Sequence, residues 1–94
     1  MTILEESIVV AVQGQLSCDL QGEAVVLHLN SGKYFGFEAV AALIWSLVQQ
    51  PRRVGEIRDA VLEQYDVART VFERDLLDFL NELQEAGLIE VKDA

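Results

Sequence analysis

The hydrophobic residues of this chain follow two different periods, and the change falls near residue 38. From 7 to 37 the sequence is rich in Val, Leu, Ile and aromatic residues and is interrupted by short glycine-containing turns, at Gln13-Gly14, Gln21-Gly22 and Asn30-Ser31-Gly32. Such punctuation predicts short strands joined by turns. The predicted strands lie near 7–12, 16–20, 23–29 and 33–37.

The turn at Asn30-Ser31-Gly32 is the strongest local signal, because Asn and Gly tolerate the positive φ of tight hairpins. A three-residue loop would pair Leu27 with Phe35 and would place His28 opposite Tyr34 on the second face. The five apolar residues that would then share one face are Val25, Leu27, Leu29, Phe35 and Phe37.

After Glu38 the apolar residues recur every three or four positions, which predicts helices over about 38–49, 54–65 and 70–86. The first helix ends before Pro51 and carries Trp45, which we expect in the core. The apolar stripe of the third helix consists of Phe72, Leu76, Phe79, Leu80 and Leu83.

Sequence signals also mark the two ends of the third helix. Thr70 and Glu73 have the spacing of a capping box at its start. Gly87 supplies its stop. The segment 88–91 that follows could add a terminal strand or simply lie extended.

Strands followed by three helices predict an α+β fold, winged-helix-like, with a small antiparallel sheet of the N-terminal strands packed against three C-terminal helices. The chain has 94 residues, 51% of them hydrophobic, and one proline, which excludes a disordered tail and a collagen-like repeat. We expect a single domain over 1–94, with its core at about 16–91 and with 1–15 as an N-terminal extension or an extra strand.

The charge balance narrows the possible partners. Sixteen acidic residues against seven Lys and Arg give a formal net charge of -9, so we expect no nucleic-acid partner. The helices alone would permit a winged-helix DNA-binding or transcriptional regulatory protein, which is the main alternative. A recognition helix needs cations, however, and 70–94 carries seven acidic residues against Arg74 and Lys92.

Residues suited to catalysis or metal binding are few. Cys18 and His28 are the only thiol and imidazole, too few for a catalytic triad or a four-ligand zinc site, so we expect no cofactor and no metal. A small enzyme that uses Cys18 is a second alternative. The apolar run Ala39 to Trp45 is too short to cross a bilayer, and no signal peptide precedes it, so we expect no membrane partner and a cytoplasmic location.

Two surface features allow opposite interpretations. If the strand Lys33 to Phe37 is an edge, its unpaired N–H and C=O groups can bind an extended peptide, unless Lys33 serves to protect that edge. The acidic side chains of the third helix form either a solvated face or a docking edge for a basic peptide. These side chains are Asp75, Asp78, Glu82 and Glu85.

A series of motifs, in this order and spacing, resembles the PqqD-like domain, the peptide-recognition element of ribosomal peptide biosynthesis. They are Gly-Glu-Ala-Val-Val-Leu at 22–27, Ser-Gly-Lys-Tyr-Phe-Gly-Phe at 31–37, Ala-Leu-Ile-Trp at 42–45, Arg-Val-Gly-Glu-Ile at 53–57, Tyr-Asp-Val at 65–67, Asp-Phe-Leu-Asn-Glu-Leu at 78–83 and Gly-Leu-Ile at 87–89. Two positions depart from the family pattern. Phe37-Glu38 stands where Leu-Asn is common, and Ala41 or Ala42 replaces a frequent glycine.

The resemblance implies a non-catalytic module that binds the leader of a precursor peptide. The chain is most similar to the leader-binding subunit of lasso peptide systems, which works with a separate cysteine leader peptidase and a cyclase. In this family the leader adds a strand to the sheet and rests against the third helix. The peptide-binding residues so implied are Lys33, Tyr34, Phe35, Gly36, Phe37, Asp75, Leu76, Asp78, Phe79, Glu82 and Leu83.

Overall fold

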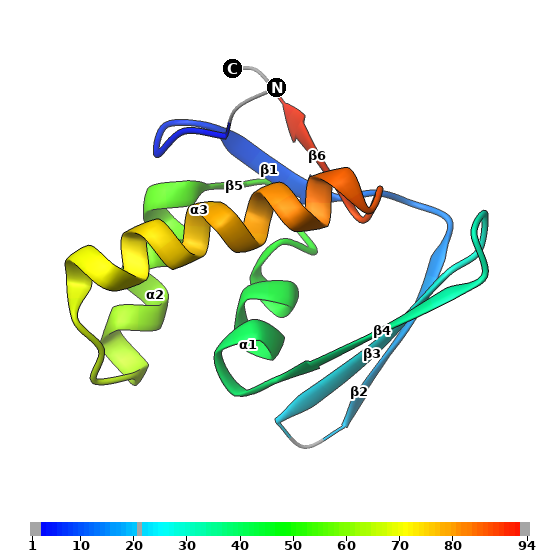
Figure 1. Cartoon of the computed structure of the whole chain (residues 1–94), viewed down its shortest axis with the longest axis horizontal. Helices are drawn as coiled ribbons and strands as arrows, with labels where there is room; N and C mark the ends of the chain where they lie inside the picture. Colours follow the sequence, from blue (N-terminus) through cyan, green and yellow to red (C-terminus); the bar gives the residue numbers. More distant parts are fainter. Residues whose placement is uncertain (1–2, 21, 93–94) are drawn as a thin grey trace.

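The computed structural model describes residues 3–20 and 22–92, which form two small antiparallel sheets and three helices (Figure 1). The predicted α+β class is confirmed, but the strands form two sheets where one was expected. The elements in chain order are β1 (Ile8–Ala11), β2 (Gln15–Leu20), β3 (Glu23–His28), β4 (Lys33–Glu38), α1 (Ala39–Leu47), β5 (Arg52–Arg53), α2 (Val54–Gln64), α3 (Arg69–Glu85) and β6 (Ile89–Lys92).

The first sheet joins distant parts of the chain. β1 lies between β5 and β6 and pairs antiparallel with both, so that Ile8 is opposite Arg53 on one side and Lys92 on the other. Residues 8–11 are therefore an extra strand, and the segment after Gly87 forms β6. The second sheet has the order β2-β3-β4, is built from two consecutive hairpins and projects to one side of the helices (Figure 1).

The register of the β3–β4 hairpin corrects the sequence prediction by one residue. Leu27 pairs with Tyr34 and Val26 with Phe35, so the loop has four residues, 29–32. Gly32 closes this loop in the left-handed region at φ 71°, and its N–H donates to the His28 carbonyl at 2.8 Å. Because side chains alternate along a strand, the shift of one residue exchanges the faces of β3.

The buried face of β3 consists of Ala24 and Val26, which are 2% and 0% exposed, whereas Val25 is 39% exposed. The prediction that Val25, Leu27 and Leu29 share a face with Phe35 and Phe37 is therefore wrong, because Phe35 and Phe37 face inward whereas Val25 and Leu27 lie on the other face. The predicted opposition of His28 and Tyr34 is also wrong. His28 pairs with Lys33 instead.

The predicted turn at Gln21-Gly22 can be compared with the structure only at Gly22, because Gln21 lies outside the described residues.

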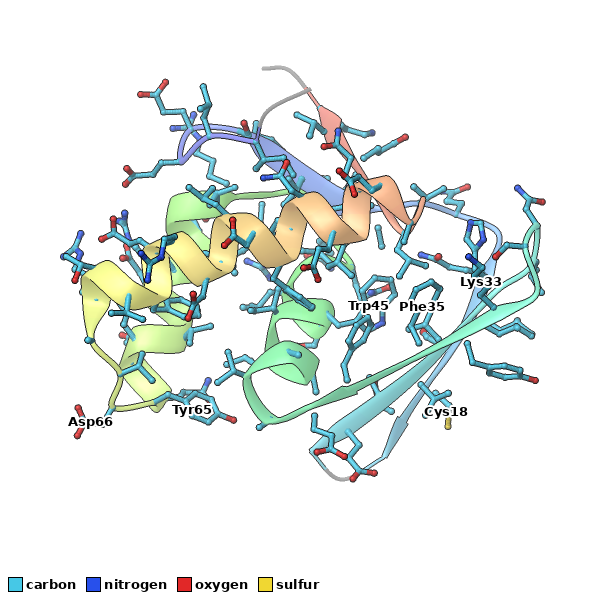
Figure 2. The ribbon with its side chains drawn as sticks, viewed as in Figure 1. Cys18, Lys33, Phe35, Trp45, Tyr65 and Asp66 are labelled. Atoms are coloured by element: carbon cyan, nitrogen blue, oxygen red, sulfur yellow. The ribbon has the colours of Figure 1, made fainter. Side chains whose placement is uncertain are left out.

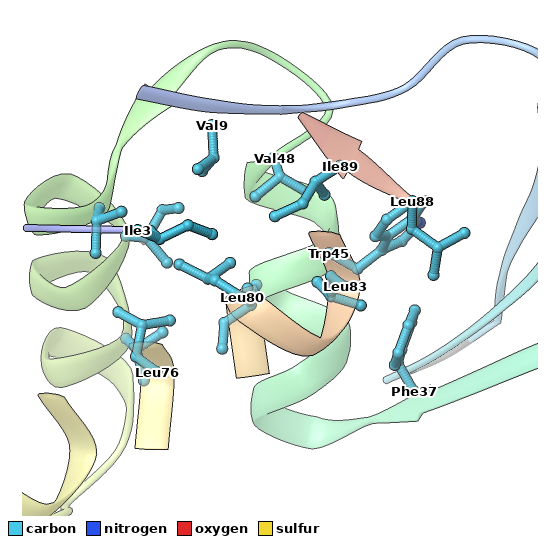
Figure 3. Packing of buried hydrophobic residues seen from close by; sticks show 14 of the residues in the cluster. Ile3, Val9, Phe37, Trp45, Val48, Leu76, Leu80, Leu83, Leu88 and Ile89 are labelled. Carbon is cyan, nitrogen blue, oxygen red and sulfur yellow. The ribbon is translucent and has the colours of Figure 1, made fainter. Parts of the chain in front are cut away.

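The helices pack on a shared core in which Trp45 is 1% exposed, as predicted (Figure 3). The ring of Phe37 lies 5.6 Å from that of Trp45 and 5.7 Å from that of Phe79, the latter edge-on. The buried face of α3 follows the expected spacing of three and four residues. Its buried members are Phe72, Leu76, Leu80 and Leu83.

The segment before β1 caps α2. The N–H groups of Val54 and Gly55 donate to the carbonyls of Ser7 and Glu5 at 3.0 and 3.1 Å, which satisfies two donors that a helix N-terminus leaves unpaired. Arg58 donates hydrogen bonds to the carboxylates of Glu5 and Asp59, and these two bonds raise the pKa of the guanidinium above its usual value. These contacts attach the segment before β1 to α2.

The start of α3 differs from the predicted capping box. The helix begins at Arg69 with Ala68 at the N-cap, and no side chain caps it. Glu73 instead accepts a hydrogen bond from Arg69 Nε at 2.8 Å, one turn earlier, so the carboxylate expected to cap Thr70 is engaged elsewhere. At the other end Gly87 has φ 79° and Leu88 N–H donates to the Leu83 carbonyl, so the predicted stop is confirmed.

The junction between β4 and α1 contains a strained residue. Ala39 has φ 50°, a left-handed conformation that costs an L-residue about 1–2 kcal/mol. We expect Ala39→Gly to raise the free energy of unfolding by about 1 kcal/mol, because glycine adopts this conformation without the Cβ clash. Urea denaturation measures the change. Ala42→Gly, within the same helix, is the matched control and should lower stability by about 1 kcal/mol; destabilisation by both changes would contradict the assigned strain.

Candidate functional site

Within the described chain, β4 pairs on one side only, with β3, so its other side is a sheet edge. The Ala39 N–H donates to the Gly22 carbonyl at 3.0 Å, which marks that pair as hydrogen-bonded. Hydrogen-bonded and non-bonded pairs alternate along an antiparallel ladder. Phe35 and Phe37 therefore use their backbone groups on β3, and Tyr34, Gly36 and Glu38 direct theirs to the open edge.

A groove of about 340 Å³ lies beside this edge, between α1 and α3. Its walls are apolar apart from one carboxylate, that of Asp75. The residues that line it are Val40, Ala41, Ile44, Val67, Phe72, Asp75, Leu76 and Phe79. Because β4 runs directly into α1, the open backbone groups of the strand and the apolar groove are adjacent (Figure 1).

The strand residues proposed for the site divide between the two faces of β4. Tyr34 points outward and is 73% exposed, and Lys33 and Gly36 are also exposed. Phe35 is half-buried and lies on the helix side of the sheet near Trp45 (Figure 2). Phe37 is buried, and its ring joins the end of β4 to Trp45 of α1 and Phe79 of α3.

The helix residues of the predicted site separate into three groups. Asp75 and Phe79 line the groove, and Leu76 forms its buried floor. Asp78 and Glu82 are exposed on the same helix. Leu83 is 3% exposed and belongs to the core, where it packs beneath Trp45 and Leu88 in Figure 3.

Half of the residues that line the groove were neither predicted site residues nor members of the apolar stripe of α3. Val40, Ala41 and Ile44 belong to α1, and Val67 to the loop before α3. One signal was present, since Ala41 or Ala42 stands where glycine is frequent in the family. The small side chain of Ala41 leaves room between the helices.

The structure does not bring the Cys18 thiol and the His28 imidazole together. Cys18 is exposed on the outer face of β2, opposite Val25, whereas His28 belongs to the inner face. His28 Nδ1 lies 2.8 Å from Ser31 Oγ instead.

No group of three or more His, Cys, Asp or Glu side chains in 3–20 and 22–92 has the arrangement of a metal site. None of the described helices is long and apolar enough to span a bilayer.

Comparison with known proteins places this geometry in a family. Residues 23–89 match the family described as coenzyme PQQ synthesis protein D (PqqD). The chain belongs to the PqqD family. This PqqD-family chain is also similar, with a TM-score of 0.81 and 40% sequence identity, to TbiB1 in its complex with the TbiA(beta) leader peptide. The match covers 90% of this chain and 99% of that one, and a search of curated proteins found no significant match.

The alternation along β4 makes neighbouring proline substitutions differ in effect. Tyr34→Pro removes an N–H that faces the open edge, so we expect unfolding free energy within about 1 kcal/mol of the parent. Phe35→Pro removes a donor to β3 and should cost about 3 kcal/mol or more. Phe35→Ala is the control that measures the loss due to the side chain alone. Thermal denaturation gives the stability of all three variants. Equal losses for the two proline variants would contradict the assigned ladder.

Proposed function

We propose that this chain is a non-catalytic recognition domain that binds the leader of a ribosomally synthesised precursor peptide by strand addition to β4, in the cytoplasm, during lasso peptide biosynthesis. The observation that carries the proposal is the open β4 edge beside an apolar groove. The similarity to TbiB1 also supports the proposal, because TbiB1 is 40% identical to this chain and its structure contains the TbiA(beta) leader peptide.

The two parts of the site supply affinity in different ways. Hydrogen bonds to Tyr34, Gly36 and Glu38 involve backbone groups, so they hold any extended peptide. Side chains of the bound strand that point inward lie over the groove, where burial against Phe79 and Ile44 selects apolar residues. Specificity thus comes from the groove and general affinity from the ladder.

The helix α3 that forms one wall of this groove also carries exposed carboxylates, of which Asp75 lines the groove. Asp75, Asp78 and Glu82 lie on one helix at three- and four-residue steps, and the whole chain carries a net charge of -9. Exposed charges chiefly change encounter rates and salt dependence. They would attract a leader rich in Lys and Arg and would repel DNA, so the winged-helix DNA-binding alternative is disfavoured.

The partner enzyme needs a second surface, and the outer face of the β2-β3-β4 sheet provides an apolar one. Leu16, Leu27 and Tyr34 form one row across the three strands, and Leu16 and Tyr34 are 60% and 73% exposed. Exposed apolar patches of this kind mark protein interaction sites. We propose that the leader peptidase docks here, directly beside the leader strand, and that the cyclase receives the peptide afterwards.

Leader binding is tested by titrating the isotope-labelled protein with the leaders of precursors encoded near it, with the TbiA(beta) leader as reference. We expect chemical-shift changes at β4 and the groove, and a loss of at least tenfold in affinity for Tyr34→Pro. Phe79→Ala should weaken binding similarly, because it removes the groove wall. Binding that Tyr34→Pro retains in full would refute strand addition at β4.

Peptidase docking is tested on the outer face with Leu16→Lys and Leu29→Lys. Both side chains are more than half exposed, so we expect unchanged folding and unchanged leader affinity. Cleavage of the leader by the partner peptidase should fall at least tenfold, since a charge within the row at Leu16, or in the adjoining loop at Leu29, opposes burial of this face. Val71→Lys, at an equally exposed position on α3, is the control. Undiminished cleavage with the outer-face variants would exclude this surface.

A further inference from the structure

Neither the backbone conformation nor the packing of the described residues requires glycine at position 36. Gly36 stands in the interior of β4. Glycine is unfavourable there because it loses more backbone entropy on folding than other residues do and has no side chain to pack. Its φ is not positive, and a Cβ built on it would meet no atom within 4 Å. The fold therefore does not require glycine here. Such a glycine is typical of a strand position where a ligand approaches closely.

A hollow lies over this glycine. It has a volume of about 390 Å³ and is lined by residues of β3 and β4: Glu23, Ala24, Val25, Gly36, Phe37 and Glu38. Val25 is the cross-strand partner of Gly36, and its exposed side chain makes an apolar wall on the outer face. The missing side chain of Gly36 leaves this hollow open toward the edge of β4.

Two glutamates close one end of the hollow. Glu23 and Glu38 are directly opposed across β3 and β4, in a pair without ladder hydrogen bonds, where side chains approach most closely. Like charges in this position are mutually unfavourable. Neither carboxylate has an ion-pair partner among the described residues. A cation placed between them would relieve the repulsion.

The ladder determines which side chain of a bound strand reaches the hollow. A strand that pairs with the open backbone groups of Gly36 places the residue opposite Gly36 on the same face of the sheet, the outer face. Its neighbours in sequence point inward to the groove. The hollow and the groove thus receive alternate side chains of one extended peptide.

We propose that the hollow over Gly36 is a subsite for one Lys or Arg side chain of the bound strand. The aliphatic stem lies across Gly36 against Val25, and the charged end lies between Glu23 and Glu38. This inference rests on the proposed function, since it assumes a peptide strand on β4. It adds a charge requirement at one position of the leader, which the apolar groove alone does not impose.

The first test separates the role of Gly36 from stability. Gly36→Val fills the hollow with a β-branched side chain, so we expect higher thermal stability together with at least tenfold weaker binding of leader peptides. Cys18→Val is the matched control, because Cys18 occupies the same row of the sheet at the opposite edge. Gly36→Val with unchanged affinity would overturn the subsite.

The second test identifies the occupant with a display library of random twelve-residue peptides. We expect peptides selected by the parent protein to share Lys or Arg at one position flanked by apolar residues. Replacing that Lys with norleucine keeps the stem and removes the charge, and should weaken binding three- to tenfold. The same replacement should have no effect on Glu23→Gln/Glu38→Gln, whereas Asp19→Asn/Glu90→Gln, the acidic control, should behave as the parent.

The outcomes distinguish this inference from the proposed function. Selected peptides that lose affinity for Tyr34→Pro but show no basic position would overturn the subsite and leave strand addition intact. Selected peptides that bind Tyr34→Pro as well as the parent, or no selected peptide at all, would contradict the proposed function itself. Equal norleucine effects on the parent and on the double glutamine variant would remove Glu23 and Glu38 from the subsite.

Discussion

The burial of Phe37 between Trp45 and Phe79 is the contact on which the geometry of the site depends. It joins the end of β4 to both α1 and α3, with ring centroids within 6 Å on each side. Because Phe37 must face inward, the alternation of the strand turns Tyr34 and Gly36 outward. The same alternation directs their backbone groups away from β3. One aromatic cluster therefore fixes which face of β4 points outward and where the strand lies relative to the groove.

Element type could be predicted from the sequence because the hydrophobic periods of two and of three to four residues are clear. The face of β3 could not, because Ala24, Val25, Val26 and Leu27 are consecutive apolar residues and allow either face to be buried. Only the loop length decides between them. An alternative loop shorter by one residue satisfies the same turn preferences, and the left-handed Gly32 that selects the longer loop is visible only in the structure.

The candidate site was predictable to a similar extent. The edge strand and the apolar stripe of α3 follow from local pattern and from the family resemblance, and the structure places Asp75, Leu76 and Phe79 at the groove. The share of α1 was missed because that helix is apolar on most of its circumference. A helix of this kind gives no signal that separates residues facing the core from residues facing a groove.

The pairing of β1 with β6 determines the order in which the two sheets form during translation. The β2-β3-β4 hairpins are local in sequence and can pair while the ribosome is still adding the helices, whereas Val9 must wait for Val91, its partner across the sheet. The sheet that holds β1 between β5 and β6 is thus completed only after β6 has left the exit tunnel. A nascent chain stalled within α3 would expose the open edge of β4 before the β5-β1-β6 sheet has formed.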